Sequence, residues 1–166
     1  MSVSNSETSR AAITFRSATT NDAPFLREML YLALFVRPGS LSYPRSILDD
    51  PAIERYVRGW GTRPGDDGII ALADAVPVGA AWLRLFAADT PGYGFVDEAT
   101  PELTIAVLPQ YRNRGIGAGL VTRLQERVPA ISLSCDPENP AWRLYLRTGF
   151  EPLTDRRTLL WTRRKR

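Results

Sequence analysis

Residues 102–120 have the sequence ELTIAVLPQYRNRGIGAGL, which contains a strand, a turn and the start of a helix. Apolar and polar residues alternate from Glu102 to Leu108, a pattern typical of a β-strand, and a proline ends it. Apolar residues then recur at helical spacing from Gly115 to Val128. The stretch therefore predicts a strand that leads through a basic, glycine-rich turn into an amphipathic helix.

This turn has the composition of an anion-binding site. Gly115, Gly117 and Gly119 stand at the start of the helix, where glycines let a ligand approach backbone N–H groups that have no partner inside the helix. The helix dipole places partial positive charge there, and Arg112 and Arg114 add full charges. The combination predicts a site for a diphosphate.

Two other interpretations of the turn exist. The glycines could serve only close packing of the helix on a sheet. A dinucleotide site of the G-x-G-x-x-G type is disfavoured, because Leu120 occupies the third glycine position. Such a site is also expected near the first strand of a chain, whereas this turn lies two-thirds of the way along.

The rest of the chain alternates between strand and helix patterns. Further strands are predicted at 13–16, 68–73, 78–87, 130–135 and 158–161, with a hairpin turn at 74–77. Further helices are predicted from about 20 to 35, from about 50 through 57, and at 139–147, with a loop at 90–101. The order predicts a mixed α/β fold with a mostly antiparallel, twisted central sheet flanked by helices. We expect residues 1–11 to form a flexible tail and residues 12–166 to form one domain.

The missing residue types exclude several kinds of chemistry. No histidine is present, which excludes Ser-His-Asp and Cys-His catalysis and histidine metal sites. Cys135 is the only cysteine, so the chain can form neither an internal disulfide nor a cysteine zinc cluster. The only lysine, Lys165, lies at the C-terminus, which excludes a P-loop. We expect no metal, and any acid–base catalysis falls to Glu, Asp, Tyr or Cys.

Polarity and charge bear on where the protein works. No apolar run is long enough for a transmembrane helix, and residues 1–10 lack the apolar centre of a signal peptide. We therefore expect a cytoplasmic protein that does not bind membranes. The net charge of +3 includes a basic cluster at 163–166, which we interpret as a solvated end and not as a nucleic-acid site.

Two motifs resemble one known family. Arg112-x-x-Gly115-x-Gly117-Ala118 is similar to the acyl-CoA signature [RQ]-x-x-G-x-[GA] of GNAT N-acetyltransferases. Residues 139–150, NPAWRLYLRTGF, resemble the family's second signature, N…A…LY…GF. The two stand in the right order, separated by a predicted helix and strand, and the resemblance extends over about residues 13–161.

The resemblance implies that acetyl-CoA is the donor and that two neighbouring segments bind it. Backbone groups of Ile105, Ala106 and Val107 would bond the pantetheine arm in the manner of an added strand, and Asn139 would contact the pantetheine side of CoA. The amides expected to bind the pyrophosphate belong to Asn113, Arg114, Gly115, Ile116, Gly117 and Ala118. In the family, the strands equivalent to 102–108 and 130–135 splay apart to admit the thioester.

The same resemblance suggests two catalytic residues. Tyr145 stands where an acid protonates the departing thiolate, although it could simply pack the last helix. Glu102 stands where family members often carry a catalytic glutamate that removes a proton from the amine; a solvated glutamate at a strand end is the alternative. Asp97 and Glu98 are alternative bases, acceptor anchors or ordinary loop charges. Cys135 ends an apolar strand without a histidine partner, so a buried structural cysteine is favoured over a nucleophile.

The acceptor is expected to be a small-molecule or peptide amine. Aromatic and acidic residues that could line its groove are Tyr31, Phe35, Tyr43, Trp60, Trp82, Tyr93, Asp97 and Glu98. The predicted activity is transfer of an acetyl group to a primary amine by direct attack on the thioester. A CoA-binding sensor of the same fold without turnover is the alternative, and a homodimer is left open.

Overall fold

A seven-stranded sheet with the order β1-β2-β3-β4-β5-β7-β6 runs through the computed structural model, which describes residues 10–165. Its strands are β1 (Ile13–Ser17), β2 (Asp67–Ala73), β3 (Val76–Arg84), β4 (Glu102–Val107), β5 (Ala130–Ser134), β6 (Glu151–Pro152) and β7 (Thr158–Thr162). All neighbouring strands are antiparallel except β4 and β5, which are parallel. The predicted fold class, a mixed and mostly antiparallel sheet flanked by helices, is confirmed.

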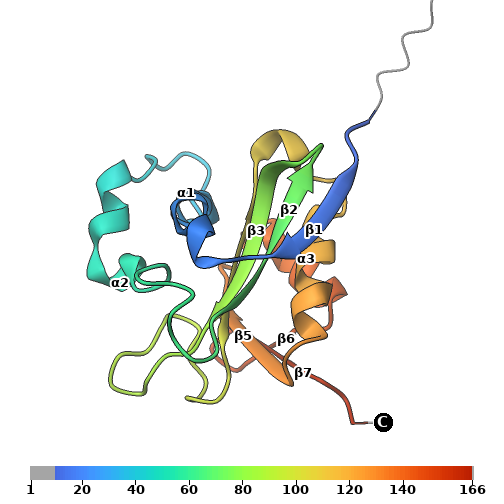
Figure 1. The fold of residues 1–166 in the computed structure, drawn as a ribbon. Helices are drawn as coiled ribbons and strands as arrows, with labels where there is room; N and C mark the ends of the chain where they lie inside the picture. Colours follow the sequence, from blue (N-terminus) through green and yellow to red (C-terminus); the bar gives the residue numbers. More distant parts are fainter. Residues whose placement is uncertain (1–9, 166) are drawn as a thin grey trace, which may run out of the picture.

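Within residues 10–165, four α-helices accompany the sheet. They are α1 (Ala23–Ala33), α2 (Pro51–Glu54), α3 (Ile116–Gln125) and α4 (Ala141–Arg147). Figure 1 shows α1 and α2 on one face of the sheet and α3 on the opposite face. Short 3-10 turns precede α1 and α2 and connect β4 to α3, at Thr20–Asp22, Arg45–Asp49 and Pro109–Tyr111.

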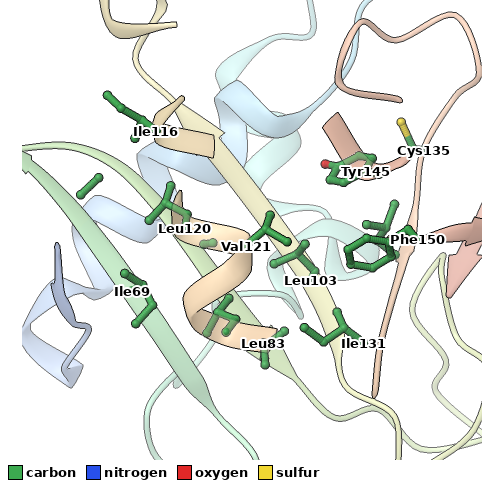
Figure 2. Close-up of a cluster of buried hydrophobic side chains, with 14 of the residues drawn as sticks. Ile69, Leu83, Leu103, Ile116, Leu120, Val121, Ile131, Cys135, Tyr145 and Phe150 are labelled. Carbon is green, nitrogen blue, oxygen red and sulfur yellow. The ribbon is translucent and has the colours of Figure 1, made fainter. Parts of the chain in front are cut away.

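Each face of the sheet has its own hydrophobic cluster, because side chains of a strand alternate between faces. On the α3 face, Leu103 packs among apolar residues of β2, β3, α3 and β5, as Figure 2 shows. On the α1 face, Ala106 packs with Trp82 and with the buried side of α1. Strand β4 therefore contributes to both clusters and lies at the centre of the molecule.

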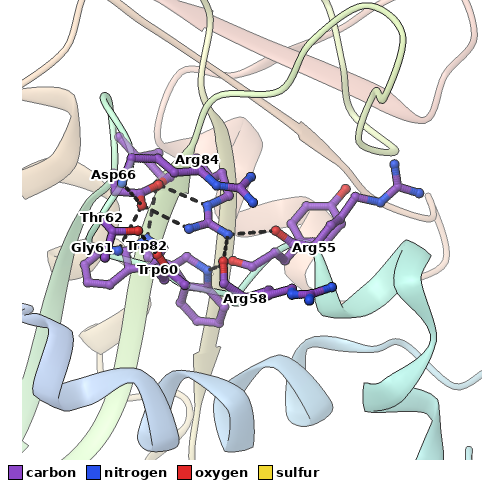
Figure 3. A network of polar contacts seen from close by, with 12 residues as sticks. Arg55, Arg58, Trp60, Gly61, Thr62, Asp66, Trp82 and Arg84 are labelled. Atoms are coloured by element: carbon purple, nitrogen blue, oxygen red, sulfur yellow. Dashed lines mark hydrogen bonds and ion pairs between the residues drawn. The ribbon is translucent and has the colours of Figure 1, made fainter.

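The predicted second helix is much shorter than expected. Asp50 caps α2 by accepting a hydrogen bond from the Ala52 N–H (2.8 Å), but the helix ends at Glu54, and residues 55–66 form successive turns. Backbone bonds between residues three or four apart continue as far as Trp60, and buried hydrogen bonds from β3 hold this turn segment in place. The guanidinium of Arg84 pairs with Asp66 (3.0 Å) and donates to the carbonyls of Arg55 (2.9 Å) and Arg58 (2.6 Å), as Figure 3 shows.

Other boundaries differ from the predictions by a few residues. The hairpin between β2 and β3 turns at Asp74 and Ala75, both with positive φ (46° and 68°), so β3 begins earlier than predicted and also ends earlier, at Arg84. Of the predicted N-terminal tail, residues 1–9 lie outside the described residues. No helix within residues 10–165 has the length and hydropathy to span a bilayer.

Candidate active site

A gap between β4 and β5 opens the middle of the sheet. The two strands share a single pair of facing residues, Glu102 and Ser132, and the Ser132 N–H donates to the Pro101 carbonyl (3.0 Å). Beyond this pair they diverge, so the sheet consists of two halves joined at one end of the gap. This divergence is the splay that the resemblance implied.

Backbone groups of β4 face the gap at alternate positions. The Leu108 N–H donates to the Val78 carbonyl (2.8 Å), and the register between β3 and β4 is unbroken. In an antiparallel ladder the residues that bond the partner strand alternate, so the backbone of Ala106 bonds β3, whereas those of Ile105 and Val107 point into the gap. The expectation that the Ala106 backbone binds a ligand is therefore wrong, because β3 already occupies it.

The turn before α3 presents free N–H groups at one mouth of the gap. Gly115 adopts a positive φ of 77° and Asn113 one of 60°, which turns the chain sharply into the helix. The first helical bond runs from the Gly119 N–H to the Gly115 carbonyl (3.1 Å). The amides of the first turn, Ile116 to Ala118, accordingly have no acceptor within the helix.

The two arginines of this turn differ in their contacts. Arg112 folds back and its Nε donates to the carbonyl of Val107 (3.1 Å), which ties the turn to the end of β4. The guanidinium of Arg114 lies over the ring of Tyr111 (5.1 Å from Cζ to the centroid). Both keep positive charge beside the free amides.

A cavity of about 170 Å³ continues from the gap toward α1. It brings together residues from α1, α2, the loop before β4, both splayed strands and α4. The lining residues are Leu30, Ala33, Leu34, Ile53, Tyr56, Tyr93, Glu102, Leu103, Thr104, Ile105, Ser134, Cys135, Asn139 and Tyr145. The cavity thus joins the backbone of β4 to both predicted catalytic residues.

Glu102 is a buried carboxyl group, only 3% exposed, and not a solvated strand-end residue. Its Oε1 accepts hydrogen bonds from the hydroxyl of Tyr56 (3.0 Å) and the N–H of Gly94 (2.8 Å). Its Oε2 is buried without a hydrogen-bond partner among residues 10–165. Burial raises the pKa of Glu102 above its ordinary value, although these two donors oppose the shift.

The loop before β4 is built around this carboxyl group. A side chain at Gly92 would collide with Glu102, because a Cβ there would lie 2.0 Å from Oε2. The hydroxyl of Tyr56 accepts a hydrogen bond from the N–H of Tyr93 (2.7 Å) and donates its own to Glu102. The three groups form one hydrogen-bonded chain.

Tyr145 and Cys135 lie together at one end of the α3-face cluster (Figure 2). The ring of Tyr145 packs edge-on against Phe150, with centroids 5.8 Å apart, and burial raises the pKa of its hydroxyl. Burial likewise raises the pKa of Cys135 to about 11, so its thiol stays protonated near neutral pH. This argues against Cys135 as a nucleophile.

Asn139 lies just before α4 and is not part of the helix, which was predicted to begin at this residue. Its Oδ1 accepts from the Ala141 N–H (2.9 Å), and the residue lines the cavity beside Tyr145. The second sequence motif thus brings Asn139 and Tyr145 to the same site.

Most of the predicted acceptor residues lie elsewhere. Of the eight acceptor candidates named from the sequence only Tyr93 lines the cavity; Tyr31 and Phe35 do not. The hydroxyl of Tyr31 donates to the Tyr43 carbonyl (2.6 Å). Trp60 and Trp82, also considered, are buried in the α1-face cluster.

The two loop acids have structural partners. Asp97 accepts from the N–H groups of Ala99 (2.9 Å) and Thr100 (2.8 Å), and Glu98 accepts from the N–H of Ala88 (2.9 Å). These contacts shape the loop, and neither residue lines the cavity, which favours ordinary loop charges among the alternatives that the sequence left open.

The sequence analysis missed several cavity residues, above all Tyr56. Its helical spacing from Ile53 and Val57 indicated the buried face of a helix, and that spacing gave no sign of its hydroxyl's partner 46 positions away. Leu30, Ala33 and Leu34 were assigned to the apolar face of α1, which is also the face that the cavity opens on.

Comparison with known proteins agrees with this geometry. A family model described as the acetyltransferase (GNAT) family matches residues 31–150. No functionally curated protein matches the chain.

Three solved structures share the fold. A GCN5-related N-acetyltransferase from Ralstonia eutropha superposes with a TM-score of 0.63 at 18% identity, covering 86% of this chain and 95% of its own. A GNAT family acetyltransferase from Brucella melitensis, solved in complex with acetyl-CoA, gives 0.60 at 17% identity (93% and 90%). An N-acetyltransferase from Thermoplasma acidophilum, in complex with coenzyme A, gives 0.57 at 14% identity (92% and 99%). Because the family model covers most of the chain, and the splayed strands and the turn before α3 accompany it, the protein belongs to the GNAT acetyltransferase family.

Proposed function

We propose that this protein is an acetyl-CoA-dependent N-acetyltransferase that transfers the acetyl group to a primary amine by direct attack. The observation that carries the proposal is the cavity in which the open backbone edge of β4, the carboxyl group of Glu102 and the hydroxyl-bearing ring of Tyr145 converge. Two of the solved structures described above were obtained with acetyl-CoA or coenzyme A, which supports the choice of donor.

In this proposal the donor binds along the α3 side of the gap. The amides of residues 113–118 hold the pyrophosphate, with the charges of Arg112 and Arg114 beside them. The pantetheine arm adds to the free edge of β4 at Ile105 and Val107, and Asn139 contacts it from α4. The thioester then reaches the cavity between the splayed strands.

The reaction needs a neutral amine, a polarised carbonyl and a protonated leaving thiol. Glu102 takes one proton from the incoming ammonium group, and its raised pKa makes it a better base than an exposed glutamate. The amine nitrogen attacks the carbonyl carbon, whose oxygen accepts a hydrogen bond from a free β4 N–H such as that of Val107. The C–N bond forms and the C–S bond breaks.

Tyr145 then gives its hydroxyl proton to the thiolate sulfur, and the second proton lost by the nitrogen restores the hydroxyl. Its raised pKa keeps the hydroxyl protonated until a basic thiolate develops beside it. Exchange of Tyr145 for Phe is expected to lower kcat roughly 100-fold, the scale of general acid catalysis, with little change in the Kd for acetyl-CoA. Unchanged turnover would remove this role from Tyr145.

Calorimetric titration with acetyl-CoA, with ADP and NAD as controls, tests the donor site. We expect binding that depends on the pantetheine arm, and its loss in Gly117→Val, whose side chain would intrude on the pyrophosphate amides. The nearest protein atom to a Cβ at Gly117 is the flexible end of Leu144 (3.0 Å), so the variant should remain folded in thermal denaturation. Equal binding of ADP, NAD and acetyl-CoA would overturn the proposal.

A further inference from the structure

The α1 side of the cavity wall is mainly apolar and aromatic. Leu30, Leu34 and Ile53 lie there, and the ring of Tyr93 stands at the loop side. The other polar side chains, Thr104, Ser134 and Asn139, belong to the splayed strands and the segment before α4, and Glu102 carries the only carboxylate among the described residues that line the cavity. A ligand that fills the α1 side therefore meets one acidic group and otherwise a surface suited largely to hydrocarbon or an aromatic ring.

Glu102 has capacity for one further donor. Both hydrogen bonds to its carboxyl group end on Oε1, while Oε2 is buried and has no partner in the described part of the chain. One carboxyl group in the cavity lining matches one ammonium group.

The charges around the cavity offer nothing for a second ammonium group. The guanidinium of Arg55 lies 5.9 Å from the ring centroid of Tyr93 and lowers the local preference for cations. Asp136 and Glu138 share one partner, Arg37 (2.8 and 3.2 Å). Neither of these acids lines the cavity.

We propose that the acceptor is a monoamine with an apolar or aromatic body, and that diamines, polyamines and amino sugars are poor acceptors. This inference rests on the proposed function and narrows it. One carboxyl group binds the single cation, the apolar wall on the α1 side holds the body, and a second cation would lose water without gaining a carboxylate partner.

The test compares acceptors that differ in one charge. Thiol release from acetyl-CoA is measured with pentylamine and with 1,5-diaminopentane, which share a chain length, and with 2-phenylethylamine and glucosamine. We expect kcat/KM to be at least about tenfold higher for pentylamine than for the diamine, a difference of about 1.4 kcal/mol, and higher for 2-phenylethylamine than for glucosamine. Equal or faster turnover of the diamine or of glucosamine overturns this inference but leaves the proposed function standing. No thiol release with any amine counts against both.

A charge placed on the wall tests the reasoning directly. Leu34→Asp adds a second carboxylate to the cavity and is expected to raise the ratio of kcat/KM for the diamine to that for pentylamine about tenfold. Leu41→Asp is the matched control, since Leu41 is 95% exposed in the segment after α1 and does not line the cavity; its ratio should equal that of the parent protein. A ratio that stays unchanged in a folded Leu34→Asp variant would contradict the proposal.

Discussion

Replacing Tyr56 by Phe removes one of the two donors to Glu102 and is expected to shift the pH dependence of catalysis. The variant keeps the ring, which packs edge-on against Phe86 with centroids 5.0 Å apart, and loses only the hydroxyl that donates to Oε1 at 3.0 Å. A hydrogen bond donated to a carboxylate stabilises its charged form and lowers its pKa. Removing the bond therefore raises the pKa of Glu102 further.

The size of the shift follows from the strength of that bond. A hydrogen bond to a charged group contributes about 1.5–3 kcal/mol, and one pKa unit corresponds to about 1.36 kcal/mol, so the pKa should rise by about one to two units. A base works in its deprotonated form, so the acid limb of the kcat/KM profile should move to higher pH by the same amount. The N–H of Gly94 at 2.8 Å remains as a donor to Glu102. It still favours the charged form and so limits how far the pKa of Glu102 rises.

The assay is kcat/KM for acetyl transfer measured at closely spaced pH values under saturating acetyl-CoA. Tyr31→Phe is the matched control, because its hydroxyl donates to the Tyr43 carbonyl (2.6 Å) and not to Glu102; its profile should superpose on that of the parent protein. If the acid limb of a folded Tyr56→Phe variant stays where the parent has it, Glu102 is not the base.

Three further outcomes are expected. Cys135, whose pKa is raised to about 11, should react with iodoacetamide at pH 8 far more slowly than free cysteine, and rapid labelling by mass spectrometry would contradict its burial. A Cβ at Gly119 would lie 2.6 Å from the ring of Phe15, so Gly119→Val should lower the free energy of unfolding by about 1–3 kcal/mol, seen in urea titration. Arg84→Met leaves Asp66 buried without its ion-pair partner and should lower the free energy of unfolding by about 3–5 kcal/mol. Adding Asp66→Asn should recover part of this loss. An Arg84→Met variant as stable as the parent would show that the ion pair is dispensable.

Features encoded within a short window were predictable from the sequence. The strand, turn and helix at 102–125 depend on alternation, glycines and helical spacing that all lie in one stretch, and the structure contains them with small shifts of boundary. The order of helices and strands was also predictable, because each element has its own spacing of apolar residues.

Features that depend on distant partners were not predictable. From the sequence, Glu102 could be either a solvated or a catalytic residue. The donors that fix its carboxyl group belong to Gly94 and to Tyr56, which is far away along the chain. The second helix was predicted through Val57 because Tyr56 and its neighbours recur at helical spacing, but it ends at Glu54, and Arg84 bonds the carbonyls of Arg55 and Arg58. For Asp97 and Glu98 the sequence left site and loop roles open, because the backbone N–H groups that they accept from become apparent only in the folded loop.

The alternation along β4 also has a kinetic consequence. Its amides lie deep in the molecule, yet only every second one is locked to β3; those of Ile105 and Val107 face the gap. In deuterium exchange, Ala106 should wait for the sheet itself to open, whereas its two neighbours exchange whenever solvent enters between the strands. The exchange rate of the Ala106 amide therefore reports how often the sheet opens. The rates of the Ile105 and Val107 amides report whether a ligand fills the gap.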